Sequence, residues 1–325
     1  MYRIARLIGL VVSSLLFVST ASAQQATSTP LLSTTPPVEF IVQTDPVSLI
    51  GAYYNAITLG DYARAYGYWI QAPNNQTESQ FQAGFADTLS ASAIVRLPVL
   101  EDPGAGNVYA LIPTLVIVER RDGSTVFFAG CFTAHRSNVP VGNATEPDPN
   151  WSLQKGELKQ VQTADLAGLD TACDTEYSLT DDPNLAPSQI DPVHLIESYF
   201  SMLVTGKADD AAALWEPNVG DMFLGAYGKE VRAALSINLY VNPTMYGEGA
   251  AGSIFVSIPA IVVTNNPDNS HLYIVGCYVA RLSDVPVGDA TTPDPNWHLF
   301  NATLKLAPDA PSAIVAAHES CFGRG

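Results

Sequence analysis

Four cysteines have the clearest chemical potential in this sequence. Cys131 and Cys173 have nearly the same separation along the chain as Cys277 and Cys321. Four cysteines allow three pairings, and they could form disulfides, bind a metal or remain free thiols. No CxxC pair accompanies them, so the ligand spacing of a structural zinc site is missing. We therefore expect disulfides and no metal site.

The chain contains similar sequence twice. Residues 45–50 return as residues 191–196, and Cys131 returns as Cys277 at the same displacement. Polar residues present in both copies are better candidates for a shared role than residues present in one. The duplication also favours the pairings Cys131–Cys173 and Cys277–Cys321, because each copy then holds one equivalent bridge.

Four tryptophans also occur as equivalent pairs and are candidate binding residues. Trp69 and Trp215 end the second expected helix of each copy, where they either anchor the core or line a ligand pocket. Trp151 and Trp297 close the most closely repeated segment, residues 137–151 and 283–297. This segment is either a loop that binds a saccharide or a protein, or a rigid connection whose tryptophan packs below the next strand. Its acidic residues lack the alternate spacing of a calcium loop.

Helices are expected at the beginning of each copy. Asp45 and Pro46 are a helix cap and first turn, apolar residues follow at helical spacing, and Gly60 suits a left-handed cap. The second copy repeats this design from Asp191 to Gly206. Two more helices are predicted in the first copy, over residues 61–69 and 79–92.

Strands are expected in the rest of each copy. Residues 107–119, 125–136 and 151–162 are rich in β-branched and aromatic residues. Hairpin turns are predicted at residues 121–123 and 266–269. Pro113 and Pro259 should lie at an edge or a bulge of the sheet, because proline cannot donate to the strand ladder. Helices followed by an antiparallel sheet indicate an α+β fold.

The amino terminus and composition favour export. Arg3 and Arg6 precede an apolar stretch over residues 7–18 and a small-residue site at 21–23, so residues 1–23 are predicted to be a signal peptide. The protein is thus expected to be secreted or periplasmic. No later apolar run is long enough for a membrane span. The net charge of −17, with 32 acidic and 15 basic residues, makes nucleic acid and anionic lipid poor partners.

The expected domain organisation follows from the repeat. Residues 24–44 are rich in Thr, Ser, Pro and Gln and are predicted to be a disordered tether. The two repeats are then expected over residues 45–176 and 191–325, with a linker over 177–190. Each repeat is long enough to have its own core.

Residues 53–57, 60–66 and Trp69 resemble the opening of the nuclear transport factor 2-like superfamily. The resemblance implies two tandem cone-shaped domains, each with about three helices on a curved antiparallel sheet. Related domains often pair, so the copies are expected to pack sheet to sheet as an intramolecular pseudo-dimer. In ketosteroid isomerase-like members a tyrosine of the first helix stabilises an oxyanion, and Tyr53 and Tyr199 match that position. The alternative is that both tyrosines simply fill the mouth of the cone.

An isomerase-like site would also need a carboxylate base. Asp102 and Glu248 are equivalent but lie among turn glycines, and Asp87, Glu119 and His135 have no clear counterparts. The sequence therefore favours a non-catalytic protein without a cofactor, which binds a small apolar ligand, a saccharide or a protein partner. The alternative is an isomerase or dehydratase that uses Tyr53 or Tyr199 with an unidentified base.

Overall fold

The computed structural model of the chain describes residues 38–39, 43–173, 188–217, 219–250, 252–286 and 291–321. The predicted signal peptide, most of the predicted tether and most of the predicted linker lie outside these residues. Residues 37–325 belong to one unit, which holds both copies. Among the described residues, no helix has both the length and the apolar character needed to cross a bilayer.

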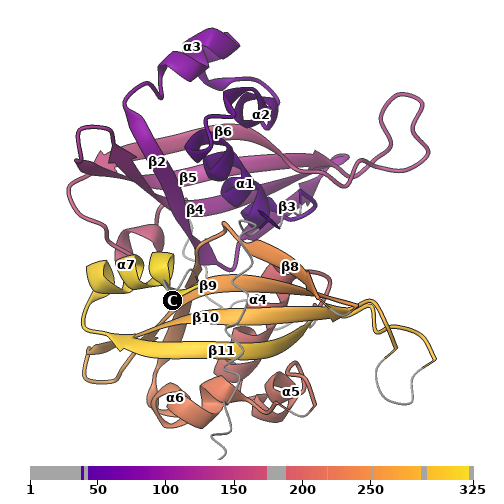
Figure 1. The fold of residues 1–325 in the computed structure, drawn as a ribbon, viewed down its shortest axis with the longest axis vertical. Helices are drawn as coiled ribbons and strands as arrows, with labels where there is room; N and C mark the ends of the chain where they lie inside the picture. Colours follow the sequence, from indigo (N-terminus) through magenta and orange to yellow (C-terminus); the bar gives the residue numbers. More distant parts are fainter. Residues whose placement is uncertain are drawn as a thin grey trace, which may run out of the picture. The chain divides into compact units, whose positions relative to one another are not determined.

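Each copy begins with a long helix, α1 (Pro46–Thr58) or α4 (Pro192–Val204) (Figure 1). The Asp45 carboxylate accepts from the backbone N–H groups of Val47 and Ser48, and the Asp191 carboxylate caps α4 by accepting from the backbone N–H of His194. Gly60 and Gly206 follow these helices with φ of 72° and 77°, a conformation that only glycine adopts without strain. The predicted caps and ends of both helices are confirmed.

Shorter helices follow in each copy: α2 (Tyr62–Gly67) and α3 (Glu78–Ala83), then α5 (Ala208–Ala212) and α6 (Met222–Ala233). The prediction of a helix through residue 92 is wrong beyond Ala83, because α3 ends there and, after a turn, strand β2 (Thr88–Leu97) begins. Its alternating residues place Ala91 and Ala93 in the core and leave Ser90 and Ser92 on the other face. Pairing with β4 decides the structure of this segment over its helical pattern.

The strands form an antiparallel sheet, so the fold is α+β. The first copy orders them β2, β4 (Asn107–Arg120), β5 (Thr125–Ser137) and β6 (Ser152–Val161), with β3 (Leu100–Gly104) beside β4. The second copy orders them β7 (Ser236–Val241), β9 (Ser253–Asn265), β10 (His271–Ser283) and β11 (His298–Ala307), with β8 (Tyr246–Ala250) beside β9. The predicted hairpins β4–β5 and β9–β10 are both present.

The two prolines lie where a strand changes its partner. β4 pairs with β3 up to Leu111 and with β2 from Thr114, so Pro113 falls in the gap between the two partners. In β9, Pro259 falls between the residues paired with β8 and those paired with β7. Neither proline faces a paired residue on that side of its strand. The missing N–H of proline therefore costs no hydrogen bond there.

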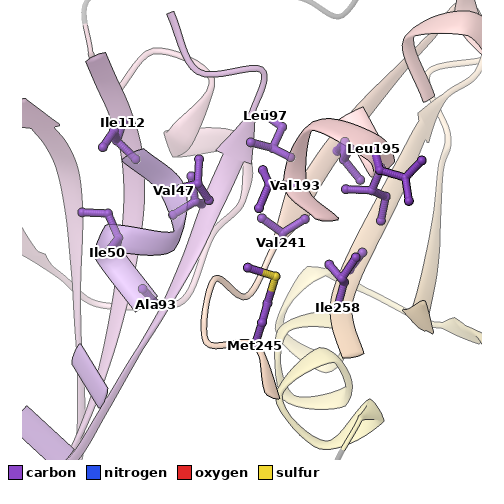
Figure 2. Packing of buried hydrophobic residues seen from close by; sticks show 14 of the residues in the cluster. Val47, Ile50, Ala93, Leu97, Ile112, Val193, Leu195, Val241, Met245 and Ile258 are labelled. Carbon is purple, nitrogen blue, oxygen red and sulfur yellow. The ribbon is translucent and has the colours of Figure 1, made fainter. Parts of the chain in front are cut away.

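The copies join edge to edge in one sheet, so the expected sheet-to-sheet packing is wrong. Val95 pairs with Val241, its own equivalent, and Leu97 pairs with Leu239. Strand β1 (Val38–Glu39), which precedes the first copy, pairs with β8 of the second. Apolar residues of both copies form one core cluster, and Figure 2 shows Val47, Leu97, Val193, Val241 and Met245 within it.

A partly buried polar network crosses the same junction. The Arg96 guanidinium donates to Asp170 Oδ1 over 2.7 Å, and the Tyr240 hydroxyl donates to the same oxygen over 3.0 Å. Asn238 donates to the other carboxylate oxygen. Because Arg96 and Asp170 belong to the first copy and Tyr240 and Asn238 to the second, these bonds stabilise the contact between copies.

Two disulfides join the ends of the copies to their sheets. Cys131 in β5 is bonded to Cys173, just after the short helix η2 (Ala167–Leu169). Cys277 in β10 is bonded to Cys321, at the end of helix α7 (Ala310–Ser320). These are the pairings that the duplication predicts.

Candidate functional site

Tyr53 and Trp69 lie together in an aromatic cluster of the first copy. Their ring centroids are 5.8 Å apart, and Phe132 is within 6.3 Å of both. Tyr53 is only 5% exposed, and burial raises the pKa of its hydroxyl. The side chain therefore remains a neutral hydrogen-bond donor and fills the space between α1 and the sheet.

Tyr199 and Trp215 form the matching cluster in the second copy, with centroids 5.9 Å apart. Here the tyrosine has a carboxylate partner, because the Tyr199 hydroxyl donates to Asp221 Oδ1 over 2.6 Å. Burial, together with the Asp221 charge, raises the pKa of Tyr199. Asp221 Oδ2 and the Tyr278 hydroxyl are buried and have no hydrogen-bond partner among the described residues.

The polar side chains beside this aromatic cluster, Asp221 and Tyr278, are not repeated in the first copy. Helix α3 is capped by Thr77, whereas α6 is capped by Asp221, whose carboxylate accepts from the backbone N–H of Leu224. Phe132 occupies the position of Tyr278. Asp221 was not predicted as a site residue, because the repeat register is lost in this region. In the sequence, Asp221 could be recognised only as a helix N-cap that precedes an apolar segment.

The other candidate acids lie on the surface. Asp102 in β3 and Glu248 in β8 are exposed, as are Asp87 and Glu119. His135 is half-buried and hydrogen-bonds to Asn107 over 2.7 Å. Within the described parts of the chain, no group of three or more His, Cys, Asp or Glu residues could hold a metal ion.

Trp151 and Trp297 are buried anchors at the ends of two loops. The backbone N–H of Trp151 donates to the Gln43 carbonyl, and that of Trp297 donates to the Gln189 carbonyl. The Trp151 indole also donates to the Thr44 carbonyl over 3.2 Å. Since Trp151 is 1% exposed, its ring offers no face for stacking on a saccharide.

The described residues between the two ends of each loop are exposed. We call residues 137–151 the first loop and residues 283–297 the second loop. Residues 138–150 are all exposed, as are residues 284–286 and 291–296. In both loops an Asp carboxylate, Asp148 or Asp294, accepts from the backbone N–H two residues later over 2.9 Å.

The two loops are nearly identical in sequence, although the buried elements have diverged. They differ only at Asn138/Asp284, Asn143/Asp289 and Glu146/Thr292. Helices α1 and α4, by contrast, share only Pro, Val, Leu, Ile and Tyr at equivalent positions. Exposed loops normally vary more than the elements they connect, so this similarity needs a reason outside packing.

Comparison with protein-family models and with curated proteins found no match for this chain.

Proposed function

We propose that this chain is an exported, non-catalytic interaction protein in which two nuclear transport factor 2-like cones present the same loop twice to a protein partner. The cone assignment is supported by the order of elements, since each copy has helices first and then an antiparallel sheet. The observation that carries the proposal is the near identity of two loops whose described residues, apart from those at the two ends, are exposed.

Packing explains only part of that identity. The backbone N–H of Asn138 donates to the Gly106 carbonyl, and that of Asp284 donates to the Gly252 carbonyl, so these bonds hold the start of each loop to the neighbouring hairpin. The tryptophans and the Asp turns are also structural. Pro140, Thr145 and Asn150 of the first loop are exposed, and each has an identical residue in the second loop.

The loop chemistry fits a protein partner better than a saccharide. Residues 147–149 and 293–295 read Pro-Asp-Pro, and both segments are exposed. Proline segments are already stiff, so an aromatic-lined groove of a partner can bind them with little further ordering. The two loops would give such a partner two equivalent binding sites.

Site-specific cross-linking tests this function. A photo-reactive residue is placed at Thr145 or at the equivalent Thr291, and the full chain is exposed to the extracellular proteins of its source. We expect both positions to cross-link the same polypeptide, and a peptide of residues 137–151 to compete at about equal efficiency for both.

The matched control carries the same photo-reactive residue at Gln82, which is exposed on α3. Cross-linking at Thr145 and Thr291 that does not exceed the Gln82 background contradicts the proposal. Different partners at the two loops would contradict the duplicated role.

The Tyr199–Asp221 hydrogen bond favours one alternative, an isomerase or dehydratase in the second copy. In that case Tyr199 would stabilise an oxyanion and Asp221 would accept a proton. Tyr199 is 0% exposed, so a substrate could reach it only if elements packed around it moved.

This alternative predicts conversion of a β,γ-unsaturated ketone to its conjugated isomer, followed by ultraviolet absorbance. Tyr199→Phe should lower turnover about 100-fold or more, because one oxyanion donor is lost. Tyr53→Phe in the first copy is the control and should leave turnover unchanged. No turnover by the unsubstituted chain would reject the alternative.

A further inference from the structure

An apolar groove lies on the face of the first sheet opposite to α1. It has a volume of about 430 Å³, which is within the range of small-molecule sites. Strands of the first copy form one wall and helix α7 of the second copy forms the other. The groove is therefore separate from the aromatic clusters and from both loops.

Two rows of side chains across three strands form the first wall. Strand register places Ser92, Ile117 and Phe127 in one row. The next row on the same face holds Ser90, Glu119 and Thr125, because alternate residues of a strand point to the same side. The first row thus offers the apolar carbon of Ile117 and Phe127 beside the Ser92 hydroxyl, and the adjacent row offers hydroxyl and carboxylate oxygens.

Helix α7, yellow in Figure 1, forms the second wall. Pro311, Val315 and Glu319 are spaced by one turn, so they share one helix face and all three are exposed. Val315 is 59% exposed although it is apolar. Ala313 and Ala317 bury the opposite face against the second sheet, and the Cys277–Cys321 bridge fastens the end of the helix.

The acidic side chains of the groove favour a ligand with a positive charge. Glu119 and Glu319 are the ionisable side chains that line it, and both are acidic. Glu119 already accepts a hydrogen bond from the Ser90 hydroxyl over 2.8 Å, so its carboxylate is oriented along the polar row. An ammonium group can donate to these oxygens in charge-assisted hydrogen bonds, whereas a carboxylate ligand would be repelled.

We propose that this groove binds amphiphilic amines, with the apolar body against Ile117, Phe127 and Val315 and the ammonium group at Glu119 and Glu319. The apolar row and the exposed helix face supply burial for the hydrocarbon. The acidic groups select the head group. This site is independent of the interaction function proposed for the loops.

Calorimetric titration with three ligands of equal chain length tests the proposal. Octylammonium should bind with one site per chain and about tenfold more tightly than 1-octanol, and octanoate should bind most weakly. Glu119→Gln combined with Glu319→Gln should remove the preference for the amine and leave the affinity for 1-octanol unchanged. Glu78→Gln, an exposed change on α3, is the control and should preserve the preference.

A second variant tests the location. Val315→Trp fills the groove from an exposed helix position, so the chain should still fold, and octylammonium affinity should fall at least about tenfold. Unchanged octylammonium binding by this variant would overturn the site. Equal binding of the three ligands, or no binding of octylammonium, would overturn the ligand class.

Discussion

Gly51→Ala is expected to destabilise the protein by about 3 kcal/mol, near the upper end of typical overpacking effects. A Cβ atom at Gly51 would lie 2.1 Å from the Pro243 carbonyl oxygen and 2.9 Å from the Thr244 nitrogen. Both contacts are with backbone atoms of the other copy, so no side-chain rotation relieves them. Helix α1 or the 243–244 segment must shift, and the buried contact between copies opens.

Urea denaturation gives the measurement, and Gly225→Ala is the matched control. Gly225 is also a helix residue, but a Cβ there meets nothing within 4 Å. The control should therefore stabilise the protein by about 1 kcal/mol through helix propensity. If Gly51→Ala has a transition midpoint equal to or above that of the unsubstituted chain, the close approach of α1 to residues 243–244 is wrong.

The sequence predicted helix ends and hairpins correctly, because their positions depend on a few neighbouring residues. Asp45 with Pro46 identifies the first residue of α1, Gly60 identifies its end, and the turn residues identify both hairpins. The disulfides followed from symmetry between copies. Each of these features depends on a few neighbouring residues or on the repeat itself.

The missed features depend on residues far apart in the sequence. Residues 88–92, the first half of strand β2, were predicted as helix because the pairing of β2 with β4 and β7 is not visible in its own residues. Asp221 was missed because Tyr199, its partner, belongs to another helix. The contact at Gly51 was also not predicted. Glu197 occupies the equivalent position in the second copy, so the repeat did not indicate that a glycine is needed there. The copies share local sequence signals but differ where they meet each other.

The pH dependence of stability should be set by acidic groups that are buried where the copies meet. Asp45 and Glu197 are 1% and 8% exposed, and the imidazole Nδ1 of His194 is 2.6 Å from Asp191 Oδ2. The first copy has Ser48 and Gly51 at the positions of His194 and Glu197, so the cluster is asymmetric.

Asp45, Glu197 and His194 each have a pKa in the folded protein that lies above its ordinary value, so folding favours the protonated form of each. Burial, and then the Asp191 charge, raises the pKa of Asp45 to about 6. Burial also raises the pKa of Glu197 to about 7, and the carboxylates of Asp45, Asp191 and Glu101 act in the same direction while His194 opposes them. Burial would lower the pKa of His194, but its hydrogen bond to Asp191 and the nearby carboxylates raise it to about 9.

All three shifts have the same consequence for stability. A pKa that is higher in the folded state contributes stability below the unfolded pKa and loses it as the pH rises through the folded pKa. Asp45 and Glu197 therefore lose their contributions between about pH 4 and 7, and His194 loses its contribution between about pH 6.5 and 9. Below about pH 4 the opposite applies to exposed carboxylates such as Asp309, because hydrogen bonds from Ser312 lower its pKa.

We therefore expect maximal stability in mild acid, with a free energy of unfolding several kcal/mol lower at pH 8 than at pH 5. Urea denaturation across this range measures the slope. Glu197→Gln keeps the side-chain shape and cannot ionise, so it should raise stability at pH 8 and reduce the pH dependence. Asp309→Asn, at the exposed cap of α7, should shift stability equally at both pH values. A Glu197→Gln profile parallel to that of the unsubstituted chain would show that the buried junction does not set the pH response.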